Sequence, residues 1–383
     1  MTPEVTVTSP IYLDHNATTP LAPGVLSVMT RYLATDFGNP SSAHGYGHAP
    51  KDALATSRAQ LAELLGAQPS EIVFTGCGSE ANTLALTGAT AARAGNLITQ
   101  ATEHPAVLET CRALAARGIR VNVLPVDEHG LVSANDLAAA LTKDTLLVSI
   151  MHANNETGTV QPIAELANLA HEAGALFHTD AAQTVGKLPL CVDDLGVDLL
   201  TVAGHKFGGP KGVGALYVRS GVELTPVIHG GGQERGLRSG TENVAGIAGM
   251  GAAAEHAVKN VATNQCRLVA LRDLLHHLLA DALGERLMLN GHPTHRLANT
   301  LNVSIAATAG AQLLSRIPQI AASTGSACHD GSINSPVLAA MGMDADRAAA
   351  AIRLSLGPST TEDQIRSAAS LLTAAALNPR SHG

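Results

Sequence analysis

The feature that most constrains this chain is the alternation, before residue 220, of short apolar runs with alanine-rich helical patterns. Such alternation is typical of βαβ units, whose strands lie parallel in one sheet. The expected helices cover residues 50–65, 80–94, 106–117 and 163–173, and the seven expected strands cover residues 71–75, 96–100, 120–125, 146–150, 175–179, 198–203 and 214–218. The pattern predicts an α/β fold built on a mostly parallel sheet.

The remainder of the chain predicts a second, smaller unit. A chain of 383 residues is long enough for two domains. A long helical pattern over residues 244–283 leads to sparser expected strands at 300–305, 320–323 and 351–355, and "STTEDQI" has the spacing of a capping box before a final helix. We expect a large domain over residues 15–255. Residues 1–14 and 256–383 would then form a small α+β domain.

Charge and hydropathy exclude several classes of protein. Lys and Arg number 24 against 32 Asp and Glu, so a net charge of −8 argues against a nucleic-acid-binding surface. No apolar run reaches the length of about 18 residues that a membrane span needs. The start, "MTPEVTVTSPIYLDH", lacks the basic and apolar stretches of a signal peptide, so we expect a cytoplasmic protein.

The five cysteines are scattered and include no C-x-x-C pair. Neither a disulfide framework nor a zinc site is expected from them. His44 and His48 have a spacing that could serve a metal, but the stretch "HGYGH" is a glycine loop without a carboxylate, so we expect no metal there. Most of the cysteines are expected to be small buried apolar side chains, and one is a candidate nucleophile.

Polar residues follow the predicted strands, at the sheet edge where open α/β sheets bind their ligands. "GCGSEAN" opens a helix after residues 71–75, and a helix start with a glycine suits a phosphate. The candidate site residues at these strand ends are Gly78, Ser79, Asn155, Asp180, Gln183, His205 and Lys206. Each of them alone has an ordinary explanation as a turn, a helix cap or an exposed loop residue.

Together, these residue types favour a pyridoxal phosphate site. A partly buried lysine such as Lys206 can bond covalently to the aldehyde of that cofactor, because burial lowers the pKa of its amine. Asp180 would keep the pyridine nitrogen protonated, so that the ring withdraws electrons. Gln183 can donate a hydrogen bond to the phenolic oxygen of the ring. The helix that begins near Gly78 would bind the phosphate.

Nine motifs carry a resemblance to a known family, over residues 11 to about 370. They are "IYLDHNATTP" (11–20), "FGNPSSAH" (37–44), "TEHPAVL" (102–108), "HANNETGTV" (152–160), "FHTDAAQTVGKLP" (177–189), "GHKFGGPKGVGALY" (204–217), "GGGQERGLRSGTENV" (230–244), "STGSAC" (323–328) and "IRLSLG" (352–357). The chain resembles the class-V, fold-type-I pyridoxal phosphate enzymes. The last two motifs narrow the resemblance to the cysteine desulfurases of the NifS/IscS type.

The resemblance implies roles for residues in each motif. Lys206 would carry the cofactor, Asp180 and Gln183 would contact its ring, and Asn155 would contact cofactor or substrate. The phosphate would be held by Gly78, Ser79 and His205, with Thr241 from the second subunit of a homodimer. The remaining roles fall to His104, which would stack on the ring and transfer protons, to Arg353, which would bind the substrate carboxylate, and to Cys328, which would accept the sulfur.

The implied reaction converts L-cysteine to L-alanine and leaves a persulfide on Cys328 for delivery to an acceptor protein. Iron–sulfur assembly, tRNA thiolation and DNA sulfur modification all remain possible destinations. The chain departs from the family pattern at two places. Ala203 stands where many relatives have a phosphate-binding serine, which bears on how the cofactor is retained. Residues 329–336 differ from the loop that usually follows the cysteine in the family, which bears on the identity of the sulfur acceptor.

Three other functions compete with this interpretation. A selenocysteine lyase or a cysteine sulfinate desulfinase would share the fold and the cofactor. An aminotransferase of the same class is less expected, because it has no use for "STGSAC". A docking partner without activity is disfavoured by the intact Lys206, Asp180, His104 and Cys328.

Overall fold

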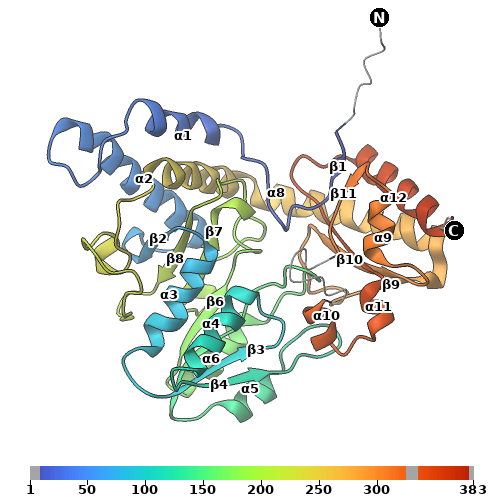
Figure 1. Cartoon of the computed structure of the whole chain (residues 1–383), viewed down its shortest axis with the longest axis horizontal. Coiled ribbons are helices and arrows are strands. Elements are labelled where there is room, and N and C mark those ends of the chain that lie inside the picture. Colours follow the sequence, from blue (N-terminus) through green and yellow to red (C-terminus); the bar gives the residue numbers. More distant parts are fainter. Residues whose placement is uncertain (1–8, 325–334, 379–383) are drawn as a thin grey trace, which may run out of the picture.

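The computed structural model describes residues 9–324 and 335–378. An N-terminal part, built on a large sheet, lies beside a smaller C-terminal part, and helix α8 (Val244–Leu283) runs from one into the other (Figure 1). No helix in the described ranges is both long enough and apolar enough to cross a membrane.

The large sheet has seven strands in the order β2-β8-β7-β6-β5-β3-β4. They are β2 (Ile72–Thr75), β3 (Asn96–Gln100), β4 (Arg120–Leu124), β5 (Thr145–Ser149), β6 (Leu176–Asp180), β7 (Leu199–Ala203) and β8 (Gly214–Val218). Strands β7, β6, β5, β3 and β4 pair in parallel, whereas β8 is antiparallel to both β7 and β2. The predicted α/β fold with a mostly parallel sheet is confirmed.

Helices cover both faces of this sheet. They are α1 (Val25–Ala34), α2 (His48–Leu65), α3 (Gly78–Thr90), α4 (Pro105–Ala115), α5 (Ala134–Ala140), α6 (Ile163–Glu172) and α7 (Val192–Leu195), with short 3₁₀ turns η1 (Gly45–Gly47), η2 (Pro69–Glu71), η3 (Gly204–Lys206) and η4 (Glu234–Gly236). Successive side chains of β2 point to opposite faces of the sheet and so reach different helix layers. Phe74 packs in the core that contains Leu61 of α2, and Val73 packs in the core that contains Leu84 of α3.

The C-terminal part is built on a three-stranded sheet of order β12-β10-β9. Its elements are η5 (Gly284–Arg286), β9 (Leu287–Leu289), β10 (Thr300–Ile305), α9 (Gly310–Ser315), β11 (Ile320–Ala321), α10 (Pro336–Ala340), α11 (Ala345–Ala349), β12 (Ala351–Ser355) and α12 (Glu362–Leu377). The predicted capping box is confirmed at Thr361 and Gln364. Strand β1 (Ile11–Tyr12) pairs with β11, so the N-terminal segment lies against this part.

Helix α8 contributes side chains to two separate cores. Ala257 packs in the core of the large sheet, and Leu268 packs in the core of the C-terminal part. We propose that the domain boundary falls between them, close to the residue 255 expected from the sequence. The pairing of β1 with β11 supports the assignment of the first residues to the small domain.

Strand β2 lies at one edge of the large sheet, and side chains bind its outward backbone groups. The Phe74 N–H donates to Glu234 Oε2 at 2.8 Å, and Arg58 Nη1 donates to the Ile72 carbonyl at 2.6 Å. Arg58 also holds both carboxylate oxygens of Glu234, at 2.7 and 2.8 Å. Glu234 and Arg235 have φ values of 48° and 58°, a left-handed backbone that costs roughly 1 kcal/mol or more per residue outside glycine.

Gly251 allows α8 to approach α2 closely, which yields a stability prediction. A Cβ added at Gly251 would lie 2.7 Å from Ser57 Cα. Gly251→Ala should therefore lower the melting temperature, because overpacking of about 1–3 kcal/mol exceeds a helix-propensity gain of about 1 kcal/mol. Gly45→Ala is the control, since an added Cβ there meets nothing within 4 Å. A Gly251→Ala protein that melts above wild type would contradict the prediction.

Candidate functional site

The predicted cofactor residues converge where β6 and β7 end. Asp180 is the last residue of β6, one position later than the sequence predicted, and pairs in register with Thr201 of the neighbouring β7. Gln183 lies in the turn after β6, and Lys206 ends η3, directly after β7. The parallel pairing of these two strands brings the three side chains to one edge of the sheet.

Two backbone carbonyls hold the amine of Lys206. Its Nζ donates to the carbonyl of Asn16 at 2.7 Å and to that of Ala17 at 2.9 Å. Burial, with the positive charge of Arg353, lowers the pKa of Lys206 to about 8, although Asp180 acts in the opposite direction. A far larger fraction of this amine than of an ordinary lysine is therefore neutral, and so nucleophilic, near neutral pH.

The carboxylate of Asp180 is fixed by two donors. The side chain of Asn82 donates to its Oδ2 at 2.7 Å, and the Ala182 N–H donates to its Oδ1 at 2.9 Å. Asp180 is buried, and Asn82 lies in the first turns of α3. The helix that starts at the candidate phosphate site thus also orients the carboxylate that would face a pyridine nitrogen.

The start of α3 has the donors and the space that a phosphate requires. Its N-cap, Cys77, makes no side-chain cap, so the first backbone N–H groups point outward beside the hydroxyl of Ser79. A Cβ added at Gly78 would lie 3.1 Å from Ala203 Cβ, so glycine allows the helix start to approach the end of β7. These residues fit the phosphate of the predicted cofactor.

His205 and His104 differ in exposure and in their hydrogen-bond partners. Burial and the charge of Lys206 lower the pKa of His205 to about 4, so its ring is neutral, and its Nδ1 lies 3.1 Å from Thr18 Oγ1. His104 is the exposed N-cap of α4, and its Nδ1 accepts from the Ala106 N–H at 3.1 Å. When neutral, His104 therefore carries its proton on Nε2.

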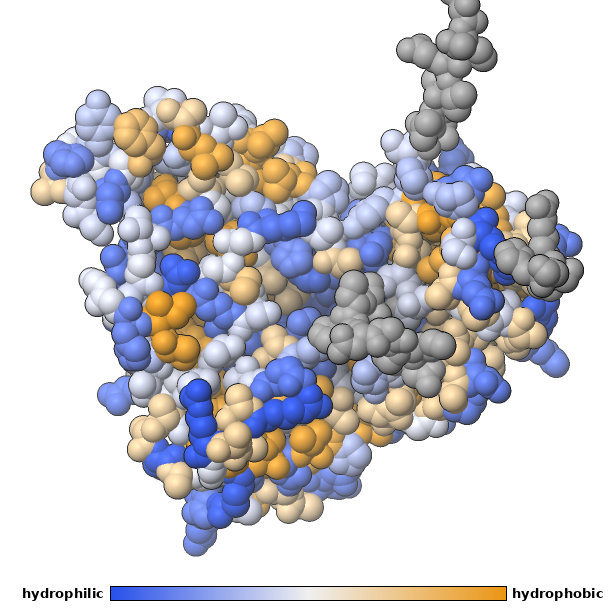
Figure 2. Space-filling view, in the orientation of Figure 1, coloured by the Kyte–Doolittle hydropathy of each residue, from blue (hydrophilic) through white to orange (hydrophobic). Residues whose placement is uncertain are grey.

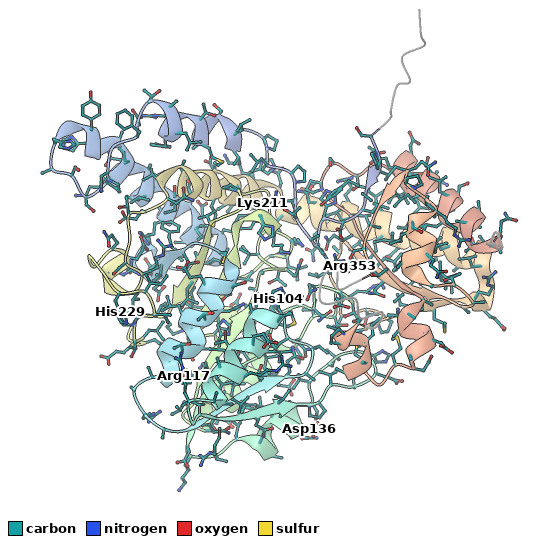
Figure 3. All side chains as sticks on the ribbon, viewed as in Figure 1. His104, Arg117, Asp136, Lys211, His229 and Arg353 are labelled. Carbon is teal, nitrogen blue, oxygen red and sulfur yellow. The ribbon has the colours of Figure 1, made fainter. Side chains whose placement is uncertain are left out.

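Arg353 and Asn155 connect the two parts of the chain. Arg353 comes from β12 and is buried, while Nη1 donates to the Asn155 carbonyl at 3.0 Å and Nη2 donates to Asp14 Oδ1 at 2.8 Å. Arg353 and His104 lie toward the middle of the molecule, where the two parts meet (Figure 3). A guanidinium there is suited to bind a carboxylate.

One predicted residue, Thr241, is not brought into this cluster. Thr241 is exposed and lines a surface pocket together with Leu33 and Phe37, at the end of α1 and beyond it. Cys328 lies outside the described residues. The roles assigned to all these residues from the sequence therefore stay predictions.

Sequence reasoning missed Asn16 and Lys187, which lie among the predicted residues. Asn16 accepts hydrogen bonds from Lys206 and Gln183 on its carbonyl, and Lys187 donates to the side chains of both Asn16 and Gln183. A signal existed for Lys187, because it is four residues after Gln183 and therefore shares one side of a helical turn with it.

The lowered pKa of Lys206 yields a prediction for protein free of small ligands. Acylation of the Lys206 peptide should rise with a midpoint near pH 8, whereas the ordinary lysine value is 10.5. Only the neutral amine reacts, so a lowered pKa moves the midpoint down. Arg353→Gln should move it up, because a nearby positive charge is removed. Peptide mapping across a pH series measures both, and a wild-type midpoint above pH 10 would contradict the prediction.

Comparisons with known proteins agree with this geometry. The class-V aminotransferase family model matches residues 11–367. The cysteine desulfurase IscS of Dictyoglomus turgidum is 45% identical over 361 residues, 93% of this chain and 91% of the relative. A solved NifS-like protein is 38% identical with a TM-score of 0.89, covering 95% of this chain and 98% of the other. The structure of SspA in complex with cysteine is 39% identical with a TM-score of 0.81, covering 91% and 99%. The chain belongs to the class-V aminotransferase family and, within it, to the cysteine desulfurases.

Proposed function

We propose that this chain is a pyridoxal phosphate-dependent cysteine desulfurase that converts L-cysteine to L-alanine and transfers the sulfur to Cys328. The observation that carries the proposal is the cluster at the ends of β6 and β7. There a lysine of lowered pKa lies beside a buried, oriented carboxylate and within the electrostatic range of Arg353. The relatives described above support the choice of cysteine as substrate.

The cofactor would be held by residues at four places. Lys206 would bond to it, Asp180 would pair with its ring nitrogen, Gln183 would donate to its phenolic oxygen, and the start of α3 would bind its phosphate. When bound, pyridoxal phosphate withdraws electrons from the amino acid attached to it. Ala203 supplies no hydroxyl to the phosphate, so we expect the helix N–H groups and Ser79 to carry most of that binding.

The protein's own groups then bind the substrate and move its protons. Arg353 binds the carboxylate of cysteine, in place of part of its contact with Asp14. The amine of Lys206, once free, accepts the proton of the substrate α-carbon, since a pKa of about 8 suits a base near neutral pH. His104 Nε2 exchanges a proton with the reacting groups.

We assign the sulfur step to Cys328. Its thiolate attacks the sulfur of the substrate, so that an S–S bond forms as the Cβ–S bond breaks. The electron pair of that bond stays with the carbon, which takes up a proton to become the methyl group of alanine. Among the described cysteines, Cys111 is unsuited to this step, because burial raises the pKa of its thiol to about 12.

We propose a homodimer in which Thr241 completes the partner's phosphate site. Thr241 is exposed and lines a surface pocket that includes no other predicted cofactor residue. Two apolar side chains of the same pocket are strongly exposed, Leu33 by 68% and Phe37 by 68%, and so are Tyr46 beside Phe37 by 66% and Leu26 of α1 by 64%. Hydrophobic residues gather on the surface over α1 (Figure 2). An apolar surface of this kind favours association with a second copy.

The persulfide prediction is tested with Cys328→Ala. This variant should bind pyridoxal phosphate normally but form less than about 1% of the wild-type alanine from cysteine, because no thiol accepts the sulfur. Cys266→Ala, at an exposed cysteine of α8, should keep wild-type activity. Mass spectrometry of wild type treated with cysteine should find one added sulfur on the Cys328 peptide. Retained desulfurase activity in Cys328→Ala would overturn the mechanism, and turnover of selenocysteine alone would indicate the lyase.

The dimer prediction is tested with Thr241→Ala. Light scattering should give twice the chain mass for both wild type and variant, because a hydroxyl contributes little to the interface. Cofactor affinity should fall about fivefold, as expected for one lost hydrogen bond of about 1 kcal/mol. A fully active monomer, or unchanged affinity in Thr241→Ala, would contradict the prediction.

A further inference from the structure

Lys187 is a partly buried lysine at the candidate site with no role in the reaction proposed above. Its Nζ donates to Gln183 Oε1 at 2.7 Å and to Asn16 Oδ1 at 3.1 Å. Among residues 9–324 and 335–378, no carboxylate forms an ion pair with it. A lysine in such surroundings is unusual, since buried lysines are ordinarily paired with an acid.

The surroundings of Lys187 disfavour its charge. Burial lowers the pKa of Lys187 well below its ordinary value, and the positive charges of Lys206 and Arg353 add to this effect. An apolar side chain would avoid that cost. The lysine differs from an apolar side chain in that it donates hydrogen bonds to two amide oxygens, and these offset part of the cost of its burial.

These hydrogen bonds decide which way two amides point. Asn16 Nδ2 faces the Asn155 carbonyl at 3.2 Å, an atom that only accepts, so Asn16 Oδ1 must face Lys187. Gln183 Nε2 in turn faces the Asn16 carbonyl at 3.0 Å, so Gln183 Oε1 also faces Lys187. Lys187 is thus the donor that both amide oxygens share.

The Asn16 carbonyl brings the nitrogen of Gln183 close to that of Lys206. It accepts from Gln183 Nε2 at 3.0 Å and from Lys206 Nζ at 2.7 Å. In pyridoxal phosphate, the phenolic oxygen is on the ring carbon next to the one that bears the aldehyde. A donor beside the lysine that bonds this aldehyde can therefore reach the phenolic oxygen, and Nε2 has a second hydrogen to give.

We propose that Lys187 is a positioning residue that, together with the carbonyl of Asn16, fixes the amide of Gln183 with its N–H end toward the phenolic oxygen of the cofactor. The inference rests on the proposed function. Without Lys187, the amide of Gln183 loses the partner of its oxygen and can turn, so that an oxygen instead of a donor faces the ring oxygen.

Lys187→Met tests this, because methionine keeps the unbranched chain but has no donor. Protein stripped of cofactor is titrated with pyridoxal phosphate, and affinity and the wavelength of the visible band are recorded. We expect affinity about fivefold weaker, equivalent to about 1 kcal/mol, and a shifted band. Lys143→Met is the control, since it removes the charge of an exposed lysine that lies before β5, at the opposite end of that strand from the site. It should leave both quantities unchanged.

A double-variant cycle separates positioning from a general structural role. In the background of Gln183→Leu, Lys187→Met should weaken binding less than twofold further, because the donor is already lost. Additive losses would overturn the inference. Gln183→Glu provides a second variant. Its carboxylate keeps Lys187 as a partner, which preserves the local structure, but the side chain has no N–H to donate to the phenolic oxygen. This variant should show the same shifted band, and a wild-type band in Gln183→Glu would overturn the inference.

The outcomes also separate this inference from the proposed function. If Lys187→Met binds the cofactor with wild-type affinity and spectrum, the inference alone fails. If the wild-type protein forms no visible band with pyridoxal phosphate, the proposed function itself fails, and the inference falls with it.

Discussion

The hydrogen bonds of Asn16 are the interaction on which the rest of the site depends. Its backbone N–H donates to Ser355 Oγ at 2.9 Å, and its side-chain nitrogen donates to Thr300 Oγ1 at 2.9 Å, both in the C-terminal sheet. Its carbonyl and its side-chain oxygen accept from the lysine and glutamine side chains that follow β6 and β7 of the large sheet. Every polar group of the buried Asn16 therefore makes a hydrogen bond, and these bonds join the N-terminal part of the chain to the C-terminal part.

Positive side chains gather around this residue, and burial and their mutual repulsion disfavour their charged forms. Burial and the charges of Lys206 and Arg353 lower the pKa of Lys187, and burial and the charge of Arg353 lower the pKa of Lys206. Asp180 and Asp14 oppose that effect at Lys206. The excess of positive charge near the strand ends suits a site for an anionic cofactor and a carboxylate substrate.

Local patterns along the chain were enough to predict the strands and the candidate residues at their ends. Strand periodicity located β6 and β7 to within one residue at each end, and the residues just after them were therefore found as site candidates. Asn16 and Lys187 were missed, since their contact joins positions 171 apart in the chain, and neither residue ends a predicted strand. Thr241 and Cys328 were found through the family resemblance, because no local pattern distinguishes an exposed threonine or a lone cysteine from its ordinary neighbours.

The contacts of Arg58 and Glu234 with the edge strand β2 affect whether other chains can associate with this sheet. An uncovered outer strand is a template on which a foreign strand can add, the route by which sheets grow into fibrils. Glu234 and Arg58 use the N–H of Phe74 and the carbonyl of Ile72, so these two groups cannot bond to a foreign strand. In the left-handed turn, the charged side chains of Glu234 and Arg235 lie against β2, where such a strand would add. The loop that contains Thr241 therefore also hinders the addition of a foreign strand at the β2 edge of the sheet.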